Sequence, residues 1–308
     1  MEPTQREVDR DLDTSMKMFE RVQLGEVAPI APRAPRQVLL ALDGSTQDAT
    51  SIEITVTLVN RYPCQVSILA ACAGAESVAE AARARLSGSA IVAAVGPEDP
   101  FDPILEAAAK HESDLVIAPC PFGRDFEMIG PDSAGTVVDV LLARLNRPIL
   151  VVREPHEIAQ PAFHHIALRS IGENEAAQAA AVWAVTLAAA GGSLELVLVF
   201  EEEMRENLSM LLKSLDLNIE TSDDNLIAAL RKAHIRLHRA LQKSAEQFDF
   251  DYTLTVEHPP ESAPFPDRSF SALSLVVVAL ERSDHMSQGY ARDCVLHRRQ
   301  PVLVVPRN

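Results

Sequence analysis

Six residues that could contact a polar ligand follow two apolar segments of the chain, 38–42 and 115–118. A carboxylate and hydroxyl groups can hydrogen-bond such a ligand, and glycines let the backbone approach it closely. Ligands of open parallel sheets bind beyond the carboxyl ends of the strands, so residues that follow two strands can share one site. The six candidates are Asp43, Gly44, Ser45, Gly123, Gly135 and Thr136.

These candidates also have purely structural interpretations. Asp43 suits a turn that joins a strand to a helix. Gly123 and Gly135 suit ordinary turns because glycine tolerates a positive φ. Thr136 is equally suited to the N-cap of a helix. The residue types alone therefore leave binding and structural roles both open.

The spacing of the polar residues does not assemble a catalytic or metal site. No combination of Ser, His and Asp or of Cys and His can be built from it, so we predict no catalytic residue. His234 and His238, four positions apart on a predicted helix, could ligate a metal. Leu230, Leu237 and Leu241 share that face, which favours histidines at the edge of a buried stripe. No metal site is predicted.

The segment 114–153 explains how the candidate residues are positioned. It contains two short apolar runs, 115–118 and 149–152, with a helical stretch between them. Such runs are typical of strands buried on both faces, and together with the helix they indicate a parallel β-α-β unit. The same arrangement, with a proline before the last run, recurs over 275–305. The chain is therefore predicted to be a duplicated fold.

The fold class predicted for each copy is α/β, a doubly wound parallel sheet of five strands. A helix is expected over 48–60 although β-branched residues weaken its pattern. The second copy carries an insertion at about 201–247 with room for two helices. The predicted boundaries are 1–36 for an N-terminal arm and linker, 37–155 for domain 1 and 163–308 for domain 2. The expected strands are 38–42, 66–72, 90–95, 115–118 and 149–152, then 166–169, 194–200, 251–256, 275–280 and 302–305.

Composition limits the partners and the compartment. The chain has 308 residues, 47% of them hydrophobic, and a formal net charge of −16, which opposes attraction to nucleic acid or anionic lipid. No apolar run is long enough for a membrane helix and the N-terminus lacks the apolar core of a signal peptide. Four cysteines without C-x-x-C spacing indicate a reducing cytoplasm. We interpret Cys120, between two prolines, as a structural thiol, with redox sensing as the alternative.

The N-terminal arm has an amphipathic pattern. Its apolar residues recur at helical spacing, and a proline-rich linker follows them. The arm is expected to dock on its own domain, and the alternative is a contact with a protein partner or in a homodimer. These apolar residues are Val8, Leu12, Met16, Phe19 and Val22.

Three pieces of domain 1 resemble the universal stress protein family. They are VLLALDGS at 38–45, ILEAAAKHESDLVIA at 104–118 after Gly96 and Pro97, and GTVVDVLLARLNRPILVV at 135–152. The resemblance covers nearly all of domain 1 and, less clearly, 164–308 as a second copy. It implies the strand order 3-2-1-4-5, a cytoplasmic role in stress, pairing of domains through the last strands and, in one branch, adenine-nucleotide binding.

The phosphate-binding pattern of that branch is only partly kept. An Asp at position 43 would accept hydrogen bonds from ribose hydroxyls, and a G-x2-G-x9-G-[ST] loop would bind phosphates. Gly135 and Thr136 match the final pair. The first glycine corresponds to Pro119, which has no N–H to donate. Gly123 can serve as the second glycine only if the loop refolds.

Three functions from different classes remain open. The leading hypothesis is a non-catalytic stress-response regulatory or scaffold protein whose domain 1 binds ATP, ADP or AMP, with Mg²⁺ offsetting the acidic loop. The first alternative is an enzyme of the same broad fold that cleaves or transfers at a phosphate. The second is a pure protein-interaction module, favoured if residues 119–135 fold into the crevice.

The two copies are expected to differ in binding and to pair with each other. Ser170 stands where Asp43 does, and the loop between the fourth strand and the last helix of domain 2 is shortened, so we predict at most one nucleotide per chain, near Asp43. The segments 149–152 and 302–305 are apolar sheet edges, and an uncovered apolar edge invites pairing. A linked second copy keeps its partner edge always available, so the last strands should pair within one chain.

Overall fold

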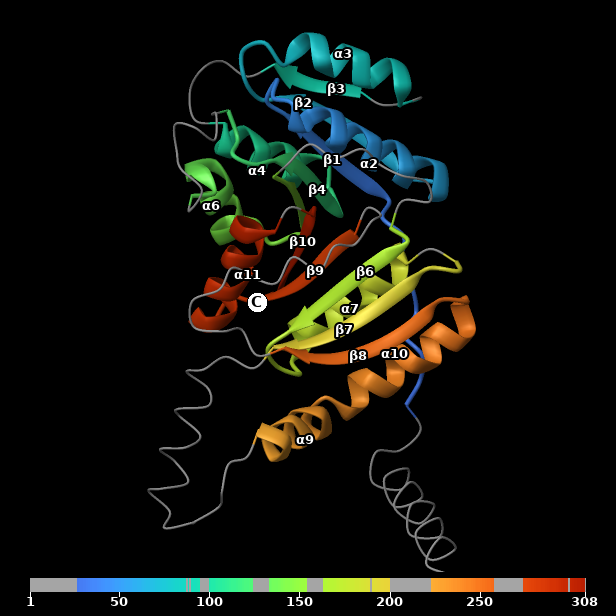
Figure 1. Ribbon diagram of the computed structural model, residues 1–308. Coiled ribbons are helices and arrows are strands. Elements are labelled where there is room, and N and C mark those ends of the chain that lie inside the picture. The colour runs from blue at the N-terminus through green and yellow to red at the C-terminus, as the bar shows by residue number, and fades with distance from the viewer. Residues whose placement is uncertain are drawn as a thin grey trace, which may run out of the picture.

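The chain folds into one continuous sheet with helices on both faces (Figure 1). The structure is a computed structural model. It describes residues 27–86, 88, 90–94, 100–123, 133–153, 163–188, 190–199, 223–257, 274–298 and 300–307. Residues 37–153 are called the first half of the molecule, and residues 163–307 are called the second half.

The first half alternates strands and helices. The helix at 47–61 forms despite its β-branched residues because its apolar face packs in the core. Its hydroxyls bond within the helix: Ser51 Oγ donates to Gln47 O, and Thr55 Oγ1 donates to Ser51 O. Ile54 and Leu58 of this helix are completely buried. The elements are β1 (Gln37–Leu42), α2 (Gln47–Arg61), β2 (Gln65–Ala70), α3 (Glu76–Arg85), β3 (Ala90–Ala94), α4 (Phe101–Lys110), β4 (Leu115–Pro119), α6 (Gly135–Arg144) and β5 (Ile149–Val152).

The second half repeats the alternation with two consecutive helices between its second and third strands. The first lies within the predicted insertion at 201–247, and the second ends one residue beyond it; 201–222 lies outside the described residues. Its elements are β6 (His165–Ser170), α7 (Glu175–Leu187), β7 (Ser193–Val199), α9 (Asp223–Ala233), α10 (Ile235–Phe248), β8 (Asp251–Glu257), β9 (Ser274–Glu281), α11 (His285–His297) and β10 (Val302–Arg307).

The sheet has ten strands in the order β3-β2-β1-β4-β5-β10-β9-β6-β7-β8. All neighbouring strands run parallel except at the centre, where β5 and β10 are antiparallel. Leu303 lies opposite Leu150 there, between the pairs Val302–Val151 and Val304–Ile149. The α/β prediction is confirmed, and the last strands of the two halves meet as their apolar edges predicted.

Two apolar layers enclose the sheet, and each layer contains residues of both halves. One layer joins the inner faces of α2, α3, α7 and α10, and includes Leu40, Leu168 and Leu303. The opposite layer joins α4, α6 and α11, and includes Leu39 and Val304. Strands covered on both faces need apolar side chains at successive positions, which explains the near-continuous apolar runs of the sequence.

The linker that precedes β1 lies against the second half. Ile30 N–H donates to Ser244 Oγ at 2.8 Å, and Arg33 N–H donates to Thr186 Oγ1 at 2.7 Å. At the end of the linker, Arg36 N–H donates to Asp114 Oδ2 at 2.7 Å. The linker thus spans both halves, whereas the amphipathic residues of the arm precede residue 27 and lie outside the described part.

Candidate functional site

The carboxylate of Asp43 lies at the carboxyl end of β1 and is already hydrogen-bonded on both oxygens. Its side chain is 7% exposed. Ser45 N–H donates to Oδ1 at 2.9 Å, and Gly123 N–H donates to Oδ2 at 2.6 Å. Gly44 allows the turn with φ of +87°, a value that glycine adopts at no steric cost. The bond to Gly123 joins the end of β1 to the loop that follows β4.

A second carboxylate, Asp48 in the first turn of α2, lies beside Asp43. It is 1% exposed and accepts hydrogen bonds from Gly44 N–H at 2.8 Å and Asp43 N–H at 3.4 Å. Burial, together with the negative charge of Asp43, raises the pKa of Asp48 to about 7. Two carboxylates on one turn therefore share the site, and Asp48 binds its proton near neutral pH.

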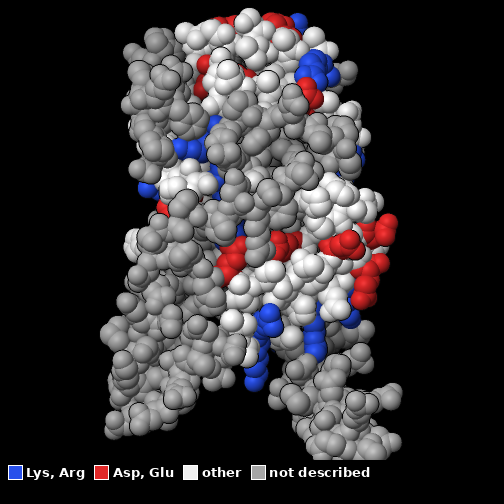
Figure 2. All heavy atoms as spheres, in the orientation of Figure 1, with Lys and Arg blue, Asp and Glu red and all other residues white. Residues whose placement is uncertain are grey.

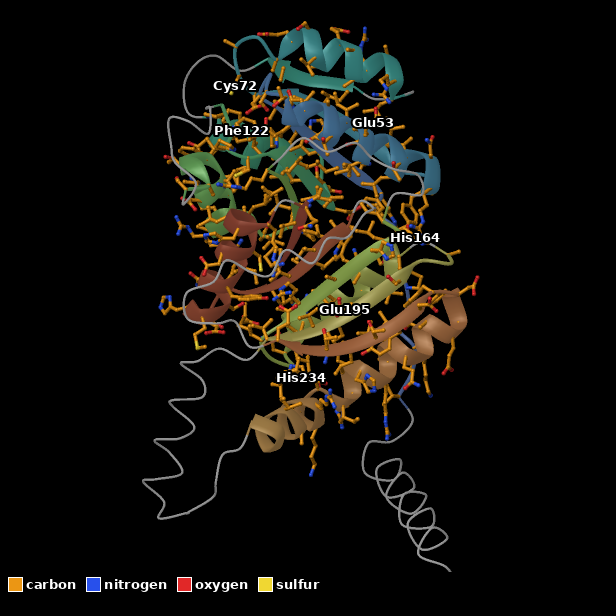
Figure 3. All side chains as sticks on the ribbon, in the orientation of Figure 1. Glu53, Cys72, Phe122, His164, Glu195 and His234 are labelled. Carbon is orange, nitrogen blue, oxygen red and sulfur yellow. The ribbon has the colours of Figure 1, made fainter. Side chains whose placement is uncertain are left out.

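Residues 120–123, which we call the β4 loop, fill the space next to Asp43. Cys120 and Phe122 are buried, and the Cys120–Pro121 peptide bond is cis. Gly123 has φ of +67°, and a Cβ added there would lie 3.0 Å from Cys72 Sγ. Cys72 and Phe122 follow β2 and β4 at the carboxyl end of the sheet (Figure 3). The β4 loop is packed too closely for a larger residue at position 123.

The start of α6 is held by its own residues. Gly135 N–H donates to Ser133 Oγ at 3.1 Å, and Gly135 has φ of +80°. Thr136 is exposed within the first turn of α6 and is not its N-cap, which is Ala134. The N-cap interpretation of Thr136 is therefore wrong. Among the described residues, no hydrogen bond joins Gly135 or Thr136 to Asp43.

The structure thus brings together part of the predicted site. Asp43, Gly44, Ser45 and Gly123 meet at the carboxyl ends of β1 and β4. Asp43 accepts hydrogen bonds from Ser45 N–H and Gly123 N–H, while Gly44 N–H donates to Asp48. A ribose hydroxyl would therefore have to share the Asp43 carboxylate with these two donors. Pro119 ends β4 and has no N–H to offer. The acidic residues expected to repel a triphosphate lie in 124–132, outside the described part.

The thiols near this site are held in the protonated form. Burial and the negative charges of Asp43 and Asp48 raise the pKa of Cys72 to about 11. Burial also raises the pKa of Cys120 to about 11, although Arg153 opposes the shift. Because the thiolate is the reactive form, these values disfavour redox sensing at Cys120.

The matching position of the second half holds a different set of groups. Ser170 Oγ donates to Gly172 O at 2.7 Å and is buried at the end of β6. The preceding residue, Arg169, is also buried; its Nε donates to Tyr290 Oη at 2.5 Å and its Nη2 donates to Glu257 Oε2 at 2.6 Å. The only sequence signal of this cluster was an arginine inside the apolar run 166–169. At the end of β6 the second half thus has a serine and a paired arginine, and the nearby carboxylate of Glu257 is bound to Arg169.

The two histidines considered as metal ligands have other partners. The predicted single helix breaks at His234, between α9 and α10, and His234 Nδ1 lies 2.9 Å from Leu230 O. His238 Nδ1 lies 2.9 Å from Tyr252 Oη. Throughout the described ranges, no group of three or more His, Cys, Asp and Glu side chains is arranged to hold a metal ion. Nor does a helix in those ranges have both the length and the apolar character for a bilayer crossing.

Comparison with known proteins relates the chain through its fold. No protein-family model matches the chain, and no curated protein sequence matches it. Its structure is similar to that of a universal stress protein from Archaeoglobus fulgidus DSM 4304, with a TM-score of 0.56 and 13% identity, covering 90% of this chain and 97% of that one. A functionally unknown protein from Pseudomonas aeruginosa PAO1 gives a TM-score of 0.56 at 14% identity, covering 89% and 93%.

These likenesses establish a fold of the universal stress protein type. They extend over nearly the whole of each chain, so both halves take part in the match. The resemblance read from the first half of the sequence is confirmed at this level.

Proposed function

We propose that the chain is a tandem stress-response protein of the universal stress protein type that regulates without catalysis. Each half would be one domain, and the protein would act in the cytoplasm. The support is the fold, shared with a universal stress protein along most of both chains. Cys120 and Phe122 of the β4 loop are buried and Gly123 N–H donates to Asp43, which favours contact with proteins over binding of a small ligand at this site.

One observation carries the preference for a role without a nucleotide: the hydrogen bond from Gly123 N–H to Asp43 Oδ2 at 2.6 Å. A charge-assisted hydrogen bond of this length is among the stronger ones in proteins. A carboxylate oxygen can accept more than one hydrogen bond, so a ribose hydroxyl would have to share Asp43 with the Gly123 N–H, next to the packed β4 loop. This crowding at Asp43 weakens the case for nucleotide binding.

A second candidate, binding of one adenine nucleotide in the first half, keeps a specific observation in its favour. Asp43 and Gly123 lie at the carboxyl ends of β1 and β4, where ligands of open parallel sheets bind. ATP, ADP or AMP, with Mg²⁺ near the acidic residues, would share the Asp43 carboxylate with Gly123. An enzyme that cleaves a phosphate bond would in addition show Mg²⁺-dependent turnover that Asp43→Ala abolishes.

Isothermal titration of the full chain distinguishes these functions. ATP, ADP, AMP and cyclic dinucleotides are each titrated with and without Mg²⁺, and we expect no saturable heat because Asp43 is already bonded. Saturable heat with one site per chain, lost in Asp43→Ala, would establish the nucleotide function instead. Two sites per chain, or a site retained in Asp43→Ala, would contradict the prediction of a single nucleotide near Asp43.

A further inference from the structure

Strand β8 is an open edge of the sheet. It has seven residues and, in the described part of the chain, pairs only with β7. All seven residues are at least partly exposed to solvent, and Asp251 and Thr253 are the most exposed of them. An uncovered edge strand presents backbone donors and acceptors that can pair with another strand.

The outward-facing groups of β8 can be assigned. Asp251 N–H donates to Gly192 O at 2.8 Å, on the side of β7. Successive N–H groups of a strand point to opposite sides in the plane of the sheet. The N–H and C=O groups of Tyr252, Leu254 and Val256 therefore face away from β7, toward the open edge.

A groove runs along this edge, between β8 and α10. Its volume is about 410 Å³. His238 and Tyr252, whose Nδ1 and Oη are 2.9 Å apart, join the helix to the strand. A sheet edge with a helix beside it is the arrangement in which an extended peptide adds as a further strand and inserts alternate side chains into pockets. The groove is lined by His238, Gln242, Ala245, Glu246, Phe250, Asp251, Tyr252 and Leu254.

The charge of the groove indicates which kind of peptide segment it binds. Its two charged residues, Glu246 and Asp251, are both acidic and exposed. The basic residues of α10, among them Arg236 and Lys243, do not line it. Figure 2 shows acidic side chains gathered where α10 ends and β8 begins, with basic side chains beneath them. A cationic segment would bind more favourably because of the negative charges of Glu246 and Asp251.

A second copy of the chain is a poorer occupant. Antiparallel self-pairing centred on Leu254 would place Asp251 opposite Glu257 twice, and like charges directly opposite destabilise a strand pair. Arg169 offsets part of the Glu257 charge, but the net charge of −16 also opposes self-association.

We propose that the edge of β8 and the groove beside α10 bind an extended basic segment of a partner protein by strand addition. The groove belongs to the second half and shares no residue with the Asp43 site. The proposal therefore stands whether or not a nucleotide binds to the first half.

Fluorescence anisotropy with the full chain tests the proposal. The probe is a labelled peptide of alternating Arg and Val, long enough to pair with all of β8, and the comparison peptide, which should bind far more weakly, has Glu in place of Arg. N-methylation of one alternate set of peptide amides removes the donors that face β8, so we expect binding to weaken at least about tenfold. Methylation of the other set should leave binding intact.

Charge reversal in the protein provides the matched control. Glu246→Lys with Asp251→Lys should weaken the Arg–Val peptide about tenfold, whereas Glu80→Lys with Glu106→Lys, an equal charge change on exposed first-half residues, should change it little. Three outcomes would overturn the proposal. The Arg–Val peptide does not bind, both methylated peptides lose the same affinity, or the two double variants change the peptide affinity equally. A concentration-dependent dimer abolished by Leu254→Pro would replace the partner with a second copy.

Discussion

At the scale of single residues, the carboxyl pair after β1 makes stability depend on pH. The pKa of Asp48 is about 7 in the folded protein and 3.8 is its ordinary value, so between about pH 4 and pH 7 the folded state alone keeps this proton. The free energy of unfolding should therefore fall as the pH rises through this window. The contribution of Asp48 is lost by pH 8.

The variant Asp48→Asn isolates this effect because an amide mimics the protonated carboxyl. We expect Asp48→Asn to be more stable than the wild type at pH 8 by about 1–3 kcal/mol and nearly equal to it at pH 5. Urea unfolding at both pH values, followed by the fluorescence of Trp183, measures the difference. The control is Asp102→Asn at an exposed ion pair, and equal differences at both pH values would contradict the assignment.

Gly123 is the residue of the β4 loop that contacts both Asp43 and the space beside Cys72. Gly123→Ala places a Cβ 3.0 Å from Cys72 Sγ at a φ of +67°, and we expect a loss of about 1–3 kcal/mol of stability. Gly88→Ala, with φ of +81° and no atom within 4 Å of its Cβ, shows the backbone part alone. Cys72→Ala should recover part of the loss in the double variant. Equal losses for Gly123→Ala and Gly88→Ala would show that packing against Cys72 is unimportant.

At the scale of elements, the end of α2 caps the end of α7. Arg61 Nη1 donates to Leu187 O at 2.6 Å, Arg61 Nη2 donates to Ala188 O, and Tyr62 Oη donates to Thr186 O. These carbonyls end a helix and have no partner within it, and a cation favours that terminus.

Removal of the Arg61 cation tests this contact between the halves. We expect Arg61→Met to lower the free energy of unfolding by about 1 kcal/mol. Arg83→Met, which removes an exposed pair with Glu80, should change it by less than about 0.5 kcal/mol. Chemical denaturation of both variants measures how much unfolding free energy each one loses. Equal losses would mean that the cap contributes nothing specific.

The elements were largely predictable, and the site was not. Apolar runs marked the strands because a sheet covered on both faces needs apolar residues at every position. The pairing of Arg169 with Glu257 depends on a contact between distant segments, which local pattern does not encode. The break at His234 also lacked a signal in the sequence. Likewise Asp43 and Gly123 were named separately as ligand contacts, while the fold uses each to satisfy the other.

At the scale of the whole molecule, the β5–β10 seam should make the two halves unfold together. Both apolar layers cross it, so fluorescence of Trp183 and far-UV circular dichroism should report one coincident transition. Leu303→Asp, which places a charge at a completely buried position of the seam, should separate the two transitions. Leu303→Val should leave them coincident. If the fluorescence and circular dichroism transitions also coincide in Leu303→Asp, the seam does not couple the unfolding of the two halves.

The antiparallel seam also imposes an order on biosynthesis. Strand β5 leaves the ribosome well before β10 exists, and at about 5–20 residues per second the wait lasts on the order of ten seconds. Throughout that interval the nascent first half exposes an apolar strand edge. Its linker also lacks the hydroxyls of Thr186 and Ser244 until those residues are made. We therefore expect the yield of folded protein to depend on translation speed and on chaperones that cover this edge during synthesis.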